Sequence, residues 1–401
     1  IYKFPQDKII AKLYLTLADC LSQQNKTEES ISIYQKITHR YPQEPQSAQA
    51  YLKLGDIYLK KEHYSEAVLY YSSFLKQYPY SEEQHKALFS LARCYLLQKE
   101  MDKALSMFFL LVNKFPQGKF RGEALFIIGD ILYRKEEYNK GLSVLRRIIE
   151  ENKTPSPLLS KTRKKIADIY LAQKKYPQAI QIYEEMLNHP YFPDEDKIYF
   201  RLGNLYKQMG DYQRAEITFK KFVKYFPLSQ DISLAYFELG DCLYKQNLYL
   251  QGIESFQKIT KQNISRELKG KTLRQIGEGY ATLTLWKKAI DAFQQSLFYL
   301  EKEEIPSLMC KIGKCYWELE DFSSARKTFS SLLNNSLKNS LSYEDYLEMG
   351  TLLAGGKREE KKMALGMYGK AIDKSLSQEE VVLALYEIGK IEQELDLTTS
   401  A

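Results

Sequence analysis

The sequence predicts an all-α fold, a right-handed α-solenoid of about ten helix pairs followed by a partial C-terminal repeat. Two observations predict this fold class. Small residues recur at intervals of 36 to 39 residues along the whole chain, and apolar residues around them are spaced three and four apart, as on the buried face of a helix. These small residues, called anchors below, are Ala18, Gly55, Ala92, Gly129, Ala167, Gly203, Gly240, Gly277, Gly313, Gly350 and Gly389.

Each unit contains a second small residue twelve positions after its anchor, and a large apolar residue four positions further on, as in Ala67 and Tyr71. This pattern predicts two amphipathic helices per unit. Helix A carries the anchor and helix B the second small residue, and the small side chains stand where the helix axes approach most closely. We expect one superhelix over residues 1–401, with repeats at about 6–42, 43–79, 80–116, 117–154, 155–190, 191–227, 228–264, 265–300, 301–337 and 338–376 and a partial repeat at 377–401.

The spacing of residue types that recurs from unit to unit resembles the tetratricopeptide repeat (TPR). One unit matches the whole motif with Gly55, Tyr58, Ala67, Tyr71 and Pro79, and a second matches it with Gly203, Tyr206, Ala215, Phe219 and Pro227. The resemblance implies stacked helix hairpins that bind other proteins. It does not identify the partner, because function depends on the site and not on the fold.

The units are longer than the usual repeat of that family, which has about 34 residues. We place the extra residues at the start of helix A, where Ser81 with Gln84 and Ser377 with Glu380 would form capping boxes. The longer first helix and the Tyr/Phe-Pro-x-Ser joint, as at residues 226–229, resemble bacterial envelope repeat proteins such as the outer-membrane-protein assembly lipoprotein and the Tol-Pal coordinator. This resemblance implies a periplasmic or envelope-associated location, with a cytoplasmic location as the alternative.

Both ends of the sequence match the interior of a repeat. Pro5 precedes Ala18 by thirteen residues, as Pro42 precedes Gly55, so Tyr2, Phe4 and Pro5 match the end of an earlier B helix. At the other terminus, Ala401 falls where a B helix would begin. We therefore expect a window from a longer protein. Because a terminal repeat exposes the face that a neighbour would cover, end-to-end or homo-oligomeric contacts are open to such a chain.

Composition and motifs indicate no catalytic chemistry. The formal charge of +7 is spread over the chain, so no nucleic-acid partner is expected. The basic run at residues 161–165 is interpreted as a solvated helix face, with binding of phosphate or of an acidic partner as the alternative. Four of the five cysteines stand two residues after an anchor, in a position predicted to be buried: Cys20, Cys94, Cys242 and Cys315. We expect no enzyme activity, catalytic residue, cofactor or metal, and no apolar run is long enough for a transmembrane segment.

The expected binding surface is the concave groove lined by the A helices. The residue after the anchor faces it, with aromatic residues four positions earlier or three positions later. The candidates are Asp56, Phe89, Phe126, Asp130, Tyr133, Asp168, Phe200, Asn204, Phe237, Asp241, Tyr244 and Trp317. Acidic groups between rings suit a peptide with basic and apolar side chains. In the alternative interpretation, the rings pack between A helices and the carboxylates are merely solvated.

The sequence therefore predicts a non-catalytic scaffold or adaptor that holds a protein or peptide partner in this groove, as a structural component of a bacterial envelope-associated assembly. A chaperone-like module that binds a secreted or unfolded client is the alternative.

Overall fold

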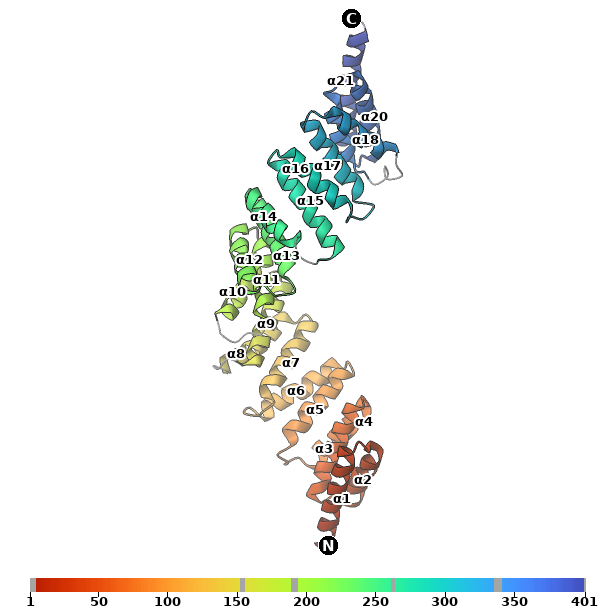
Figure 1. Cartoon of the computed structure of the whole chain (residues 1–401). Coiled ribbons are helices and arrows are strands. Elements are labelled where there is room, and N and C mark those ends of the chain that lie inside the picture. Colours follow the sequence, from red (N-terminus) through yellow and green to blue (C-terminus); the bar gives the residue numbers. More distant parts are fainter. Residues whose placement is uncertain (1–4, 152–155, 189–193, 261–263, 335–340, 400–401) are drawn as a thin grey trace. The chain divides into compact units, whose positions relative to one another are not determined.

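The computed structural model describes residues 5–151, 156–188, 194–260, 264–334 and 341–399, and every regular element in these ranges is a helix (Figure 1). The chain divides into two compact units, residues 1–193 and 194–401. The predicted end of an earlier B helix at Tyr2 and Phe4, and Ala401 at the other terminus, lie outside the described residues.

The first unit holds ten helices in five consecutive pairs. They are α1 (Pro5–Gln23), α2 (Thr27–Arg40), α3 (Pro45–Lys60), α4 (Tyr64–Gln77), α5 (Gln84–Leu97), α6 (Met101–Lys114), α7 (Arg121–Arg134), α8 (Tyr138–Glu151), α9 (Pro157–Ala172) and α10 (Tyr176–Leu187).

The second unit continues with five pairs and one further helix. They are α11 (Glu195–Gln208), α12 (Tyr212–Tyr225), α13 (Ile232–Lys245), α14 (Tyr249–Thr260), α15 (Arg266–Thr282), α16 (Trp286–Leu297), α17 (Ile305–Glu318), α18 (Phe322–Asn334), α19 (Tyr343–Ala354), α20 (Arg358–Lys374) and α21 (Gln378–Thr399).

Helix packing within each unit follows chain order. Most helices pack on the next one, whereas α19 packs on α17 and α20. A helices of neighbouring repeats also touch, as in the pairs α1–α3 and α11–α13. Every predicted repeat interval holds one helix pair, and α21 is the A helix of the partial repeat. The prediction of an all-α solenoid is confirmed, while a single superhelix through both units stays a prediction.

The anchors lie where the two helices of a pair come closest. A Cβ atom added at Gly203 would lie 2.7 Å from the ring of Phe219, sixteen residues later on the B helix, and one at Gly55 would lie 2.6 Å from the ring of Tyr71. The rings of Phe219 and Tyr71 are fully buried. The anchor is small because a large side chain of the partner helix fills the space beside it, which confirms the interpretation of the repeat pattern.

The turn from helix A to helix B contains a residue with left-handed backbone. Glu62 has φ 61°, its N–H donates to the Leu59 carbonyl at 3.1 Å, and the His63 N–H donates to the Tyr58 carbonyl at 2.9 Å. These two hydrogen bonds form the Schellman motif, which ends a helix. The equivalent residues are Asn25, Lys99, Glu136, Lys174, Gly210, Asn247, Thr284 and Glu320, so only one of these nine turns uses glycine.

The connections from helix B to the next helix A correct one prediction. Helix α5 begins at Gln84, and Ser81 Oγ accepts from the Glu83 N–H at 3.2 Å, so Ser81 does not cap the helix. The Gln84 side chain instead donates to the Tyr78 carbonyl at 3.0 Å. Since α5, α7 and α13 have only 14 residues each, the extra residues of these units extend the connection and not helix A.

The second predicted capping box is present at the start of α21. Ser377 Oγ accepts from the Glu380 N–H at 3.2 Å, and a Glu380 carboxylate oxygen accepts from the Ser377 N–H at 3.3 Å. Two N–H groups at the helix start are thereby satisfied, as predicted.

Candidate protein-binding surface on the A helices

The acidic residues that follow the anchors are occupied by partners within the chain. Asp56 accepts a hydrogen bond from the Tyr71 hydroxyl at 2.5 Å, and its second oxygen lies 2.8 Å from Nζ of Lys86 on the next A helix. Asp19 in the first repeat likewise accepts from Tyr34 at 2.5 Å and pairs with Lys53. These carboxylates are therefore not free to receive a basic peptide.

Asp130 shows the same pairing at a more enclosed position. Its oxygens lie 2.7 Å from Lys165 Nζ on α9 and 2.8 Å from Arg134 on its own helix, and its side chain is 21% exposed. Nζ of Lys165 also stands 4.8 Å from the centre of the Tyr133 ring, a cation–π contact. The predicted residues Asp130 and Tyr133 thus share one lysine, which links α7 to α9.

In the second unit, Lys207 of α11 bridges two carboxylates of α13. It contacts Asp241 and lies 2.6 Å from Glu238. Burial lowers the pKa of Lys207, but the hydrogen bonds to Asp241 and Glu238 outweigh that effect and raise the pKa overall. The ammonium therefore stays charged, and the cluster links neighbouring A helices.

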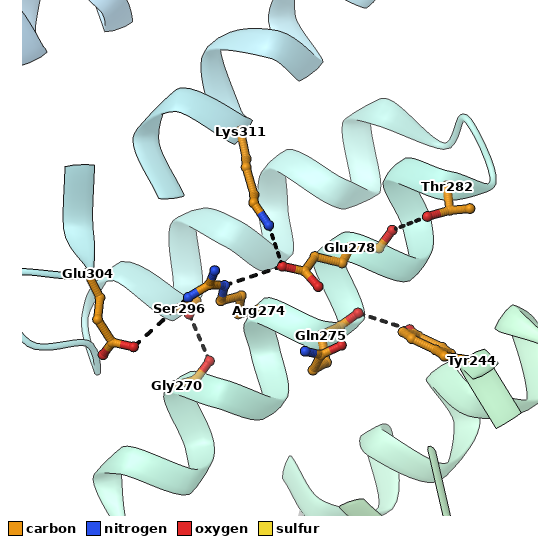
Figure 2. A network of polar contacts seen from close by, with 9 residues as sticks. All are labelled: Tyr244, Gly270, Arg274, Gln275, Glu278, Thr282, Ser296, Glu304 and Lys311. Carbon is orange, nitrogen blue, oxygen red and sulfur yellow. Dashed lines mark hydrogen bonds and ion pairs between the residues drawn. The ribbon is translucent and has the colours of Figure 1, made fainter. Parts of the chain in front are cut away.

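Figure 2 shows the corresponding network further along the second unit. Lys311 of α17 donates to Glu278 Oε1 of α15 at 2.5 Å, and Arg274 reaches the same oxygen at 3.3 Å from one turn earlier. Tyr244 of α13 enters from the opposite side and donates to the Gln275 carbonyl at 2.9 Å. Polar contacts thus connect three consecutive A helices.

Most of the predicted aromatic residues pack inside the fold. Phe89 is 5% exposed and stacks on Phe120 with ring centres 4.8 Å apart. Phe200 meets Phe219 edge to face, and Phe237 meets Phe256 in the same way. Phe200 and Phe237 thus pack on B helices and not between A helices as in the alternative interpretation, and the part of these rings in binding stays a prediction.

The remaining candidates are distributed along both units. Trp317 is half-buried and packs edge to face on Phe322 at 4.8 Å, while Asp168 on α9 and Asn204 on α11 are half-buried. Within the first unit, the structure groups Phe126, Asp130 and Tyr133 on α7, but it does not gather the twelve residues into one site.

Sequence reasoning missed the lysines that pair with the acidic row. Lys53, Lys165 and Lys311 each stand two residues before an anchor, and each pairs with the acidic residue that follows the previous anchor. A search for charges at a constant distance from the anchors would have found this pattern.

A cleft of about 1030 Å³ opens in the first unit beside Phe126. It lies between the connection from α6 to α7, the first turns of α7, the end of α8 and the start of α9. Its lining includes Lys119, Gly122, Phe126, Ile127, Leu158 and Lys161. Lys161 belongs to the basic run that was interpreted as a solvated face; it is exposed, but it also borders this cleft.

One wall of the cleft is fixed by a two-point ion pair. Arg121 on α7 donates to both Glu151 oxygens of α8, at 3.1 and 2.8 Å, and to the Val112 carbonyl at 2.9 Å. Hydrogen bonds from Arg121 are the main cause that lowers the pKa of Glu151, opposed by burial and aided by the charges of Arg121 and Arg147. The pair is geometrically specific, because a guanidinium fork matches a carboxylate.

Comparison with known proteins agrees with the repeat geometry. Residues 170–233 match the family model of the tetratricopeptide repeat, and residues 6–138 match that of an outer membrane lipoprotein, YfiO. Over these two stretches, the chain is similar to both families.

Solved structures of tetratricopeptide repeat proteins are similar to this chain. The C-terminal part of a TPR repeat-containing protein from Cytophaga hutchinsonii is 18% identical with a TM-score of 0.50, over 62% of this chain and 95% of that one. A tetratricopeptide repeat protein from Parabacteroides merdae is 15% identical with a TM-score of 0.40, over 66% of this chain and 97% of that one.

The thiols of this TPR protein are mostly buried. Burial raises the pKa of Cys94 to about 11 and that of Cys242 to about 12. Cys20 is exposed, so its predicted burial is wrong. Cys94 packs against the preceding repeat through Leu52 and Tyr71, whereas Cys20 belongs to the first repeat, with no preceding helix pair among the described residues.

Two features are absent from the part of the chain that the structure describes. There, no three His, Cys, Asp or Glu side chains gather in a way that could hold a metal ion. None of the described helices combines the length and the apolar character needed to cross a bilayer.

Proposed function

We propose that this TPR protein is a non-catalytic scaffold that holds a protein partner on the A-helix face of its first unit. The observation that carries the proposal is the cleft beside Phe126, where half-buried Phe126, Ile127 and Leu158 remain open to an incoming side chain. A binding site is expected where apolar surface is concave and rimmed by polar groups. Elsewhere on this face, ion pairs between neighbouring A helices occupy much of the polar surface.

The proposed setting is a bacterial envelope-associated assembly. The match of residues 6–138 to the family of an outer membrane lipoprotein supports it. The native gene product, tagged at its C-terminus and followed through cell fractionation, should be recovered with the envelope or periplasm. Recovery in the cytoplasmic fraction alone would contradict this part of the proposal.

Site-specific photo-cross-linking in the source cells tests the binding surface. A photoreactive phenylalanine analogue replaces Ile127 at the cleft, and the matched control replaces Leu69, which is 61% exposed on the B helix α4. We expect one or a few partners to cross-link from position 127 and to co-purify in fixed stoichiometry, with none of them captured from position 69.

Two outcomes would overturn the scaffold. Equal capture from both positions would mean that the cleft is not the contact surface. Transient capture of many unfolded chains, without a stoichiometric complex, would instead support the chaperone-like module.

A further inference from the structure

We propose that the cleft beside Phe126 takes an acidic, amphipathic segment of the protein partner, and not a basic one. This inference rests on the proposed function and names the chemistry of the partner. Two properties of the first unit carry it: a break in the charge pairing between neighbouring A helices, and a set of cations without ion-pair partners around the cleft.

The break lies between α5 and α7. In the pairs Asp19–Lys53, Asp130–Lys165 and Glu278–Lys311, the residue after one anchor meets the residue two before the next anchor. In α5 and α7 these two positions hold Arg93 and Ile127. The position after the anchor thus holds a cation, and the position where three other repeats place its opposite charge holds an aliphatic residue.

Arg93 retains its charge for an incoming group. It is exposed, and its guanidinium stands 6.0 Å from the centre of the Phe89 ring on its own helix. This contact leaves the hydrogen-bond donors of the guanidinium open, because the fork donates in the plane and not to a ring face. Within the described part of the chain, no carboxylate forms an ion pair with it.

The rim of the cleft adds further positive charge. Lys119 and Lys161 line it and Lys164 follows one turn later on α9; all three are exposed, and none forms an ion pair with a described carboxylate. The carboxylates of the lining are Glu123 and Glu151, and Arg121 already neutralises Glu151. Within the lining, the unpaired cations Lys119 and Lys161 therefore outnumber the unpaired carboxylate of Glu123, which leaves a positive excess.

The floor of the cleft supplies the apolar part of the recognition. Phe126 and Ile127 are adjacent on α7, and Leu158 faces them from the first turn of α9. A Cβ at Gly122 would lie 2.8 Å from Leu158, so the absence of a side chain there lets α9 approach α7 at the closed end. An amphipathic helix that inserts apolar side chains here would place the residues between them against the lysines.

Binding of synthetic amphipathic peptides to the purified chain tests the inference. The peptides share their leucine and phenylalanine positions and carry glutamate, glutamine or lysine at the others. We expect the glutamate peptide to bind on the order of tenfold more tightly than the lysine peptide, and added salt to weaken that binding. Equal or tighter binding of the lysine peptide, or no binding of any peptide, would overturn the inference.

Charge reversal locates the contact. The double variant Lys161→Glu/Lys164→Glu should bind the glutamate peptide on the order of tenfold more weakly, because each exposed charge pair contributes modestly. The matched control Lys76→Glu/Lys221→Glu changes the net charge equally at exposed positions of the B helices α4 and α12. An equal loss in both double variants would contradict binding at the cleft.

The cross-linking experiment separates this inference from the proposed function. If a partner cross-links at position 127 and the complex is unaffected by Lys161→Glu/Lys164→Glu, the scaffold stands and the acidic segment is wrong. If no partner cross-links at position 127 although the glutamate peptide binds with the expected selectivity, the preference of the cleft for an acidic segment is supported and the proposed function is wrong.

Discussion

The hydroxyl of Tyr71 on α4 donates a 2.5 Å hydrogen bond to Asp56 on α3, directly beside the anchor Gly55. Burial, and then the charge and hydrogen bond of Asp56, raise the pKa of Tyr71, so the phenol remains a donor at neutral pH. The same pairing recurs as Tyr34 with Asp19 at 2.5 Å and Tyr368 with Thr351 at 3.2 Å. The hydroxyl that a buried tyrosine brings into the helix crossing is thus satisfied by the residue after the anchor.

Substitution Tyr71→Phe should destabilise the first unit by about 1–3 kcal/mol, because a hydrogen bond to a charged group is lost. Chemical denaturation measures the free energy of unfolding. Asp56→Asn and the double variant complete a cycle, in which the double variant should cost less than the sum of the single ones. Additive costs would show that the two side chains do not stabilise each other.

Substitution Gly203→Ala should destabilise the second unit by about 1–3 kcal/mol, because the new methyl group would overlap the buried Phe219 ring. Gly366→Ala on α20 is the matched control, since a Cβ there meets nothing within 4 Å. The control should stabilise by about 0.5–1 kcal/mol through helix propensity. Thermal unfolding followed by circular dichroism distinguishes the two variants. Equal shifts of their unfolding temperatures would contradict the close helix crossing at Gly203.

Substitution Thr284→Gly should raise stability by about 0.5–1 kcal/mol. Thr284 has φ 58°, a left-handed conformation that a β-branched side chain adopts at a cost. Thr282→Gly, two residues earlier in the last turn of α15, should lower stability instead because the backbone there is helical. The urea concentrations at the midpoints of unfolding compare the two variants with the native chain. A lower midpoint for Thr284→Gly would show that the left-handed backbone at this turn is not strained.

Cys20 should be the thiol that reacts rapidly with a chromogenic disulfide reagent in the native protein. The other four cysteines are buried, and burial raises the pKa of Cys94 and Cys315 to about 11, which keeps these thiols protonated at pH 8. The Cys20→Ser variant should lose the fast phase, while urea should release all remaining thiols. A fast phase that survives in this variant would contradict the burial pattern.

The pair Arg121–Glu151 should make stability depend on pH in acid. Because the folded pKa of Glu151 is lowered, its contribution is fully present above the unfolded pKa of about 4.3 and is lost as the pH falls through the lower folded value. The stability gap between the native chain and Glu151→Gln should be constant near neutrality and shrink below about pH 4.

Glu150→Gln is the control for that pH series. Glu150 is the exposed neighbour of Glu151 on α8, and Arg121 and Arg147 form their ion pairs with Glu151 and not with Glu150. Its substitution should leave the curve unchanged. A gap for Glu151→Gln that stays constant down to pH 3 would show that the ion pair does not contribute.

Periodicity was sufficient to predict the helices because most anchors share one physical reason to be small, a large buried side chain on the partner helix, as Phe219 is for Gly203. The apolar periodicity alone does not show that the acidic row is paired; the pairing of Asp130 with Lys165 follows from the constant positions of the charges relative to the anchors. Ser81 was misassigned because its capping box depended on the Gln84 side chain, which bonds to Tyr78 instead. The cleft depends on how the connection after α6 folds, and no short-range pattern specifies that.

The turns around Glu62 and its counterparts have an evolutionary consequence. Main-chain hydrogen bonds close each of these turns, and asparagine, lysine, glutamate and threonine all occupy the left-handed position. Substitutions at this position therefore change the residue type while the helix hairpin is kept. Adding or deleting one residue would break both bonds together. Lineages of this chain should therefore diverge freely in the identity of these residues while their number is held constant by selection.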